Sequence, residues 1–450
     1  MNALKDISQF YFVGIGGIGM SALARYMNLL GKQVQGYDRS PTKLTNELIR
    51  EGMDVTFIDE VSNVERQLKP EETLVVYTPA IPDENNILRY FRENNYKVVK
   101  RAKLLGDVTR DTFCLAVAGT HGKTTTSAIL GHLLAECDMP VTAFLGGIAE
   151  NYDSNFISKG TEITVVEADE FDRSFLQLRP DVACITSTDA DHLDIYGNAT
   201  SLEDSFREFA RLIPKKENLF YKKGLDFEGQ SVGINEPANF EARNIKIDDG
   251  EYMFDLVTPN GTIEDLRFLI PGHHNLQNAV TALGMAISAG TPTPCLPKAL
   301  QSFRGVQRRF SYRIKSSDLV VIDDYAHHPT EINALHQAVS EMYPEDRKLI
   351  VFQPHLFSRT RDFMDGFAES LSKFDEVLLL DIYPAREMPI TGIDSQELCR
   401  RITVPSKQLV TKAGLPEMVQ NSRCRVKLLV GAGDIGEEVD KIVKFLQDEG

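Results

Sequence analysis

The sequence predicts an α/β protein of three domains. Short apolar runs alternate along the chain with amphipathic stretches of helical length, a pattern typical of doubly wound sheets. Two glycine-rich turns each stand between such a run and such a stretch, and the 450 residues suffice for roughly two to four domains. We expect a Rossmann-like domain over 1–108, a central P-loop ATPase-type domain with a parallel sheet and an antiparallel annex over 109–307, and a C-terminal α/β domain over 308–450.

The first glycine turn predicts a phosphate site in the N-terminal domain. It reads Gly-Ile-Gly-Gly-Ile-Gly over 14–19 and lies between the apolar run 10–13 and an amphipathic stretch, as a dinucleotide fingerprint does. The next apolar run ends at Asp38, about where an acidic side chain binds a ribose hydroxyl. The pattern indicates a phosphate and a ribose rather than a nicotinamide. The alternative is that the glycines serve only tight packing of a helix on a strand. The proline-bearing loop 78–82 is either a ligand-binding strand end or a plain turn.

The second glycine turn predicts a polyphosphate site. It reads Gly-Thr-His-Gly-Lys-Thr-Thr-Thr over 119–126 and joins an apolar run to an amphipathic stretch, so backbone amides and a helix N-terminus converge on one point. Lys123 can reach the outer phosphates, and the Thr124 hydroxyl can bind Mg²⁺. Val117 stands where the usual P-loop has its first glycine, which leaves the shorter Gly-x-x-Gly-Lys-Thr form. The alternative is a glycine-rich turn beside a chance lysine.

An acidic cluster follows the apolar run 163–166, in the manner of a Walker B element. We choose Glu167 as the Mg²⁺ ligand because it lies closest to the end of the strand. The following acids, Asp169, Glu170 and Asp172, are alternatively a solvated acidic turn.

Further polar residues follow in the central third. His192 lies in an acidic loop after the next apolar run, which makes it a candidate second metal ligand, although a lone histidine is usually an ordinary polar side chain. Asn275 can cap the helix predicted to follow, and Asn278 can face a base or a phosphate. From the residues alone, both asparagines are interpreted as caps.

Several apolar runs of the last third end in charged or aromatic side chains. Because the carboxyl ends of parallel strands share one edge of a sheet, we expect these side chains to gather there. For any one of them alone, a surface role is equally consistent with the pattern. The side chains concerned are Arg309, Asp324, His327, His355 and Arg359.

Composition excludes some partners. The net charge of −16 and the lack of basic runs argue against nucleic acid or an anionic membrane. The six cysteines are scattered without metal-binding spacing, so we interpret them as reduced thiols, several of them buried in strands. The N-terminal stretch lacks a cleavage site and no run approaches a membrane span, which favours the cytoplasm.

Seven motifs together resemble the Mur ligases over essentially the whole chain, and the longer motifs are specific. The opening glycine motif is most like the first ligase of that family's series. The motifs are Gly-Ile-Gly-Gly-Ile-Gly-Met-Ser, Gly-Thr-His-Gly-Lys-Thr-Thr, Glu-Ala-Asp-Glu, Ala-Asp-His, Gly-His-His-Asn-Leu-Gln-Asn, Asp-Asp-Tyr-Ala-His-His-Pro-Thr-Glu and Gly-Ala-Gly-Asp-Ile.

The resemblance implies an ATP-dependent amide ligase of peptidoglycan precursor synthesis, with UDP-N-acetylmuramate, L-alanine and ATP as substrates and two Mg²⁺ ions. The sugar nucleotide would be bound by the first domain, through Gly14, Gly16, Gly17, Gly19, Asp38 and Ser40. ATP would be bound through Gly119, Thr120, His121, Gly122, Lys123, Thr124, Thr125, Asn275, Asn278, Arg309 and Asp324. The metal ligands would be Thr124, Glu167 and His192, and the alanine side would hold His327, His355 and Arg359. The catalytic set would be Lys123, Glu167, His192, Arg309, His327 and Arg359.

The sequence departs from the family at one position. Related ligases carry a carbamylated lysine near a metal, and Ala210 stands near that position here, so no such lysine is expected. We expect a monomer or a weak dimer. The competing functions are a nicotinamide-dependent oxidoreductase, a nucleotide-gated binding protein and, among similar ligases, a folylpolyglutamate-synthetase-like enzyme or a peptide-recycling ligase.

Overall fold

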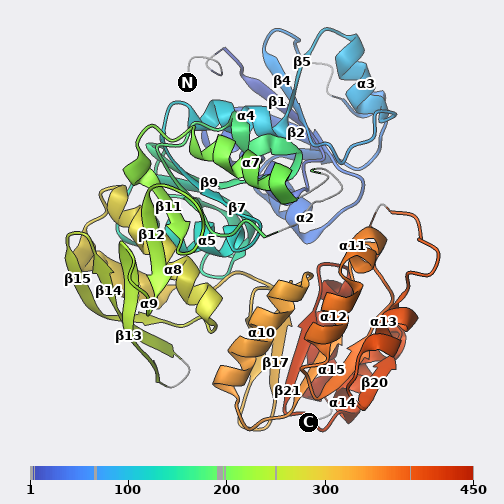
Figure 1. Cartoon of the computed structure of the whole chain (residues 1–450). Helices are drawn as coiled ribbons and strands as arrows, with labels where there is room; N and C mark the ends of the chain where they lie inside the picture. Colours follow the sequence, from blue (N-terminus) through green and yellow to red (C-terminus); the bar gives the residue numbers. More distant parts are fainter. Residues whose placement is uncertain are drawn as a thin grey trace. The chain divides into compact units, whose positions relative to one another are not determined.

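The computed structural model of the protein describes residues 4, 6–64, 68–189, 196, 199–248, 251–385 and 387–448. This part of the chain forms three sheets and divides into two compact units (Figure 1). Unit 1 comprises Met1–Ile245, Phe254–Arg267 and Gln277–Phe303, and unit 2 comprises Lys246–Met253, Phe268–Leu276 and Arg304–Gly450. Among the described residues, no helix combines the length and apolar character needed to cross a bilayer.

The first sheet is Rossmann-like, as predicted. Its strand order is β3-β2-β1-β4-β5, and every pairing is parallel. The order reverses at β1 and β4, and doubly wound sheets bind ligands beside the carboxyl ends of the strands at such a reversal. The strands are β1 (Gln9–Val13), β2 (Gln33–Tyr37), β3 (Asp54–Thr56), β4 (Thr73–Tyr77) and β5 (Lys97–Lys100). The helices are α1 (Ile18–Leu29), α2 (Lys43–Arg50), α3 (Asn86–Glu93) and α4 (Arg101–Thr109).

The second sheet is mixed, and it carries the P-loop. Its order is β15-β14-β13-β12-β11-β10-β6-β9-β7-β8, with β6, β9, β10 and β7 parallel and the edge strand β8 antiparallel to β7. These strands are β6 (Phe113–Ala118), β7 (Val141–Ala149), β8 (Ser154–Ser158), β9 (Ile163–Ala168), β10 (Val182–Ile185) and β11 (Leu219–Lys222). The helices are α5 (Lys123–Glu136), α7 (Ala199–Ala210), α8 (His273–Ser288) and α9 (Leu296–Ser302).

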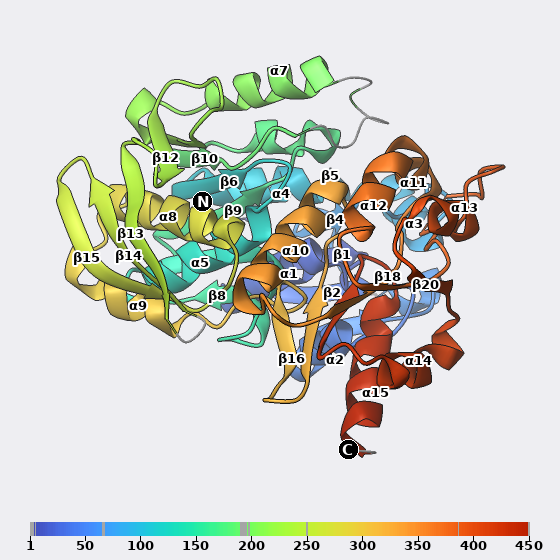
Figure 2. The ribbon, with the colours of Figure 1, turned by 60° about the horizontal axis from the view of Figure 1, so that its bottom comes forward.

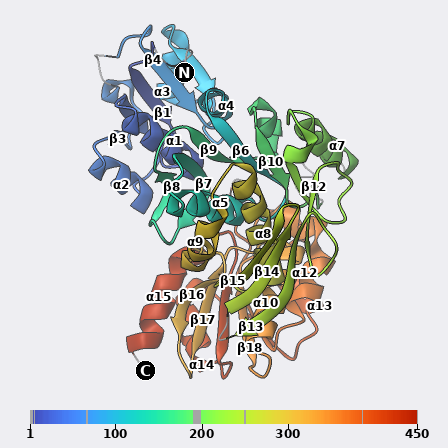
Figure 3. The ribbon, with the colours of Figure 1, turned by 90° about the vertical axis from the view of Figure 1, so that its left-hand side faces the viewer.

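The short alternating segments of 230–270 predict that the antiparallel annex begins at residue 230, but it begins later. Strand β12 (Gln230–Ile234) still pairs in parallel with β11 and with β13 (Phe240–Asp248). The neighbours β14 (Glu251–Thr258) and β15 (Gly261–Phe268) are joined by only two residues, a connection that antiparallel strands alone allow. Figure 3 shows β13, β14 and β15 side by side.

The third sheet confirms the predicted C-terminal α/β domain. Its order is β16-β17-β21-β18-β19-β20, parallel except for β16. Helices α10 and α12 cover one face and α14 and α15 the other (Figure 2). The strands are β16 (Ser311–Lys315), β17 (Val320–Asp324), β18 (Lys348–Phe352), β19 (Glu376–Leu379), β20 (Ser406–Leu409) and β21 (Val426–Val430). The helices are α10 (Pro329–Met342), α11 (Phe357–Asp362), α12 (Met364–Leu371), α13 (Ser395–Arg401), α14 (Leu415–Asn421) and α15 (Ile435–Asp448).

Helix α1 fastens the first sheet to the second. The buried Arg25 guanidinium donates to both carboxylate oxygens of Glu51, at 3.0 Å each, and to the side-chain oxygen of Asn155 on β8. Asn155 in turn donates to the Ile18 carbonyl and, at 2.9 Å, to the Ser21 hydroxyl. Because the partners of a buried arginine must stay in place to balance its charge, these contacts fix the start of α1 against the central sheet.

Cys137 and Cys295 form a disulfide, so the expectation that all six cysteines are reduced is wrong. Their Cα atoms lie 5.7 Å apart, although 158 positions separate them in the sequence. Cys137 follows the last residue of α5, and Cys295 ends the 3₁₀ turn η5 (Thr293–Cys295) ahead of α9. Two of the predicted buried strand thiols are present, in β6 and β10. The free thiols are Cys114, Cys184, Cys399 and Cys424.

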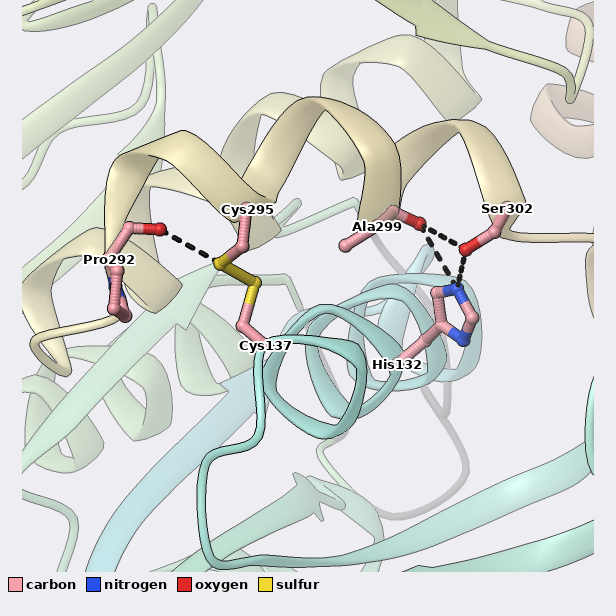
Figure 4. Close-up of a disulfide and its surroundings, with 6 residues drawn as sticks. All are labelled: His132, Cys137, Pro292, Cys295, Ala299 and Ser302. Carbon is pink, nitrogen blue, oxygen red and sulfur yellow. Dashed lines mark hydrogen bonds between the residues drawn. A yellow bond between two sulfur atoms is a disulfide. The ribbon is translucent and has the colours of Figure 1, made fainter.

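His132 fastens α5 to α9 beside this disulfide (Figure 4). Its Nε2 lies 3.1 Å from the Ala299 carbonyl oxygen, so Nε2 carries the proton and donates. Its Nδ1 lies 2.9 Å from the Tyr152 hydroxyl and accepts. Burial lowers the pKa of His132, which keeps the ring neutral. The contact between the two helices therefore has a covalent tie at one end and a neutral hydrogen-bonded histidine at the other.

Thiol titration in denaturant tests the disulfide. We expect four thiols per chain without reductant and six after reduction. Cys295→Ser should lower the free energy of unfolding by roughly 2–5 kcal/mol in urea titrations, because the lost cross-link frees a long loop of the unfolded chain. Cys399→Ser, which removes an unpaired thiol, is the matched control and should change it by less than about 0.5 kcal/mol. Six thiols in unreduced protein would refute the pairing.

Candidate active site

The P-loop is shaped by two glycines and by the end of the neighbouring strand β10. Gly119 and Gly122 have φ of +131° and +83°. A Cβ on Gly119 would lie 2.1 Å from the Thr186 hydroxyl, so conformation and space both require glycine there. The Ser187 hydroxyl accepts the His121 amide proton at 2.8 Å and lies 2.7 Å from the Thr120 hydroxyl. These contacts hold the loop at the carboxyl edge of the sheet, ahead of the N-terminus of α5, as predicted.

Lys123 is held by a buried acid. Its Nζ donates to both carboxylate oxygens of Glu170 at 2.8 Å and to the Gly119 carbonyl at 2.6 Å. Burial lowers the pKa of Lys123, but the charges of Glu170 and its acidic neighbours outweigh that effect and raise the pKa overall. The lysine therefore stays charged at neutral pH. Glu170 has no exposed surface, so interpreting it as part of a solvated acidic turn is wrong.

Glu167, the chosen metal ligand, points at the start of α5. Its carboxylate accepts hydrogen bonds from the Thr124 hydroxyl at 3.2 Å, the Ser127 hydroxyl at 3.1 Å and the Gly146 amide. A Cβ on Gly146 would lie 2.5 Å from Glu167 Oε2, so a larger residue there would displace the carboxylate. Burial raises the pKa of Glu167, and the Gly146 amide and Lys123 counteract part of that rise.

The metal-ligand set is only partly described. Thr124 and Glu167 present two neighbouring oxygens, the ligand type that Mg²⁺ prefers. Within the described residues, no group of three or more His, Cys, Asp or Glu is arranged to hold a metal ion. His192, the second candidate ligand, lies outside the described residues.

The two asparagines of α8 differ in what they contact. Helix α8 begins at His273, so Asn275 lies inside its first turn and does not cap it. Its side-chain amide donates to the Pro271 carbonyl at 2.6 Å instead. Asn278 faces the P-loop, because its side-chain oxygen lies 2.7 Å from where a Cβ on Gly122 would stand.

The first glycine turn lies against two neighbouring segments. The Gly16 amide donates to Asp38 Oδ2 at 2.7 Å, and Asp38 Oδ1 accepts the Arg39 amide proton, so Asp38 holds the turn itself in place. A Cβ on Gly14, whose φ is +91°, would lie 2.9 Å from the Thr78 side chain. The loop after β4 thus lies beside the turn, whereas Ser40 is exposed in the segment after β2.

In unit 2, the predicted strand-end side chains gather at the carboxyl edge of the third sheet. The rings of His327 and His355 are 6.2 Å apart, and Arg359 Nη1 lies 3.4 Å from His355 Nδ1. Burial, His327 and Arg359 lower the pKa of His355 to about 4. Burial also lowers the pKa of His327, against the nearby carboxylate of Glu331. Both rings are therefore neutral at pH 7. Tyr383, which the sequence did not single out, stacks on His355.

Asp324 and Arg309 lie beside the group formed by His327, His355 and Arg359. Asp324 accepts the amide protons of Phe310 at 2.7 Å and Ala326 at 2.8 Å. Burial raises its pKa to about 6, against the opposing effect of Arg309. The guanidinium of Arg309 lies over the Tyr325 ring, 5.3 Å from its centre. Arg308, absent from the predicted set, lies 5.1 Å from the same ring centre.

Three family models match the chain. They are described as Mur ligase family, catalytic domain, over 9–112, Mur ligase middle domain over 117–286, and Mur ligase, glutamate ligase domain, over 308–435. The chain is 56% identical over 445 residues to UDP-N-acetylmuramate–L-alanine ligase of Flavobacterium johnsoniae, with 99% of each chain covered. It is 57% identical over 451 residues to the enzyme of that name from Christiangramia forsetii, with 100% of each covered.

Solved structures agree in fold. The crystal structure of UDP-N-acetylmuramate–alanine ligase from Thermotoga maritima matches with a TM-score of 0.82 and 27% identity, covering 98% of this chain and 100% of the other. A murein peptide ligase of Psychrobacter arcticus matches with a TM-score of 0.70 and 20% identity, covering 98% of each chain, and supports the fold alone.

The raised pKa of Asp324 gives unit 2 a pH-dependent stability. The folded chain holds a proton on Asp324 up to about pH 6, whereas an unfolded aspartate loses it near pH 4. The folded state binds more protons in that window, so the contribution of Asp324 to stability falls as the pH rises from 4 to 6. Asp324→Asn should make the urea midpoint of unfolding depend less on pH between 4.5 and 6.5. An unchanged pH dependence would contradict the assignment.

Proposed function

The chain belongs to the Mur ligase family, and on this basis we propose that it joins L-alanine to the lactyl carboxylate of UDP-N-acetylmuramate at the expense of ATP. ADP and phosphate leave, and the product is a peptidoglycan precursor. The observation that carries the proposal is 56–57% identity, over essentially full length, to relatives that bear the name of this reaction. The P-loop, which follows β6 and has Lys123 as the first residue of α5, supports it from the structure.

The reaction proceeds in two steps. A lactyl carboxylate oxygen attacks the γ-phosphorus of ATP, an O–P bond forms, and the bond from that phosphorus to the ADP oxygen breaks. The amine of L-alanine then attacks the acyl phosphate carbonyl, the C–N bond forms, phosphate leaves and the nitrogen loses its proton. Carboxylate and triphosphate repel each other, so the first step needs fixed positive charge at the γ-phosphate. Lys123 supplies it by exchanging Glu170 for phosphate oxygens.

Two Mg²⁺ ions are part of the proposal. The Thr124 hydroxyl and the Glu167 carboxylate fit one ion, because both are hard oxygen donors and lie side by side at the P-loop. His192 is assigned to the second ion through the family resemblance. When bound, the ions neutralise charge that develops on the phosphates. Ser127 and the Gly146 amide keep Glu167 in position for this role.

The remaining assignments follow the chemistry of each residue. Asn278 borders the P-loop, and we assign Asn275, Arg309 and Asp324 to ATP with it. The neutral rings of His327 and His355 do not repel the ammonium group of alanine, and Arg359 beside them suits its carboxylate. The glycine turn of the first sheet, with Asp38 and Ser40, is assigned to the sugar nucleotide.

Organisation and location are also proposals. We place the domain boundaries at 1–108, 109–307 and 308–450, and we infer a monomer or weak dimer in the cytoplasm. The disulfide between Cys137 and Cys295 opposes that location, because cytoplasmic thiols are normally kept reduced.

Phosphate release tests the reaction. We expect release only when UDP-N-acetylmuramate, ATP and L-alanine are all present. Lys123→Ala should lower turnover at least about 100-fold, since one preorganised contact to developing charge contributes roughly 3–4 kcal/mol. Lys103→Ala removes a partly exposed lysine paired to Asp107 and is the matched control. Release that ignores the sugar nucleotide would refute the ligase, and oxidation of NADH would favour the oxidoreductase.

Gly146→Ala tests the metal assignment. The added Cβ should push the Glu167 carboxylate from its place, so a higher Mg²⁺ concentration should be needed for half-maximal phosphate release. Mg²⁺-dependent binding of an ATP analogue gives a second measurement. Gly414→Ala is the control, because its Cβ would meet nothing closer than 3.7 Å. An unaltered Mg²⁺ dependence in Gly146→Ala would remove Glu167 from the ligand set.

A further inference from the structure

Arg101 occupies the space that Gly19, the last glycine of the first turn, leaves open. It is the first residue of α4, directly after β5, at the carboxyl edge of the first sheet. A Cβ on Gly19 would lie 2.9 Å from Arg101 Nη1 and 3.4 Å from its Cδ. Gly19 is not among the glycines with positive φ, so its backbone conformation does not demand glycine. A side chain at this position would have to displace the guanidinium instead.

Few protein contacts hold the guanidinium among the described residues. Its one polar contact among the described residues is to Asp169 Oδ2 at 3.5 Å, longer than a normal charge-assisted hydrogen bond. The side chain is 24% exposed and Asp169 is 39% exposed, so the pair faces solvent. A guanidinium has five N–H donors in a planar fork, and most of these are still to be satisfied by water or a ligand.

Arg101 also stands beside the backbone donors of the turn. The amides of Gly14 and Ile15 donate to the Tyr37 carbonyl, and that of Gly17 donates to Gly14. Asp38 takes the Gly16 amide. The next amides belong to Ile18 and Gly19, in the first turn of α1, where a helix end favours an anion. Gly19 thus belongs to the first turn of α1 and also lies against the Arg101 guanidinium.

Position and charge both link Arg101 to the acid substrate. Arg101 lies between the glycine turn and Asp169. Asp169 directly follows β9 and stands two residues after Glu167. Glu167 and Glu170 make that region acidic, and a sugar-nucleotide acid adds a diphosphate and a carboxylate. Because these acids repel an anionic substrate, a cation between the glycine turn and Asp169 is needed to hold that substrate near the P-loop.

We propose that Arg101 is a further substrate-binding residue, which exchanges Asp169 for an oxyanion of the sugar-nucleotide acid, and that Gly19 lacks a side chain to leave room for its guanidinium. This inference rests on the proposed function. Diphosphate and carboxylate oxygens offer the same acceptor chemistry to a guanidinium, so the ligand is named here as an oxyanion of that substrate.

Calorimetry with two sugar nucleotides tests the role of Arg101. Arg101→Ala should weaken UDP-N-acetylmuramate binding about 10- to 100-fold, and Arg101→Lys should restore only part of it, because a lysine lacks the planar fork. UDP-N-acetylglucosamine has the diphosphate but no lactyl carboxylate. An equal loss for both ligands identifies the diphosphate as the partner, and a loss for the first alone identifies the carboxylate. Unchanged affinity in both variants would overturn the proposal.

Asp169→Asn separates substrate binding from a structural tie. If Arg101 only held Asp169 in place, Arg101→Ala and Asp169→Asn would weaken sugar-nucleotide binding alike. That result would overturn the proposal. We expect Asp169→Asn to bind at least as tightly as the unaltered protein, because it removes the competing acid. Binding of an ATP analogue should stay unchanged in Arg101→Ala and shows that the variant is folded. An unaltered protein that does not bind UDP-N-acetylmuramate would refute the proposed function, a result distinct from binding that ignores Arg101.

A double-mutant cycle tests the explanation of Gly19. Gly19→Ala should displace the guanidinium and weaken binding about as much as Arg101→Ala does. In the Arg101→Ala background, the same substitution should add less than about twofold. A loss from Gly19→Ala of the same size in both backgrounds would mean that the glycine serves helix packing, and it would overturn the proposed fit.

Discussion

The buried ion pair between Lys123 and Glu170 is the constraint on which the P-loop depends. A lysine ammonium is costly to bury unless an opposite charge lies beside it. The P-loop therefore keeps its shape only while Glu170 balances the charge of Lys123. In the proposed function, a triphosphate takes the place of Glu170 as the acceptor of Lys123. Glu167, which we propose as an Mg²⁺ ligand, is held in place beside it by Ser127 and the Gly146 amide. Stability and chemistry therefore rest on the same few charges.

The second constraint is that the first glycine turn is carried by a helix fixed to the central sheet. Arg25 and Asn155 join α1 to β8 through buried hydrogen bonds, within unit 1. The turn and the P-loop are therefore held by one compact unit, although different sheets supply them. The contact between Arg101, after β5, and Asp169, after β9, is a second link between the first and second sheets, at their carboxyl edges.

Local pattern predicted the three sheets, the place of both glycine turns after a strand, and the gathering of side chains around His327, because each depends on the residues that directly follow a strand. The contacts made across long separations were not predictable. The alternative of a solvated turn stayed open for Glu170, since nothing in its sequence neighbours shows that it pairs with Lys123. The partner of Cys137 lies 158 positions away, so no spacing rule could find it. Asn275 was misjudged because α8 starts at His273, three residues earlier than a cap at Asn275 would place its first residue.

The central claim is that the carboxylate of the acid attacks the γ-phosphorus of ATP at the P-loop. UDP-N-acetylmuramate labelled with ¹⁸O in the lactyl carboxylate tests it directly, by mass spectrometry of the phosphate released during ligation. An acyl phosphate intermediate requires that each phosphate carry one oxygen atom from the carboxylate, and this is the result we expect. Phosphate without the label, formed at the same rate as the amide, would contradict the account.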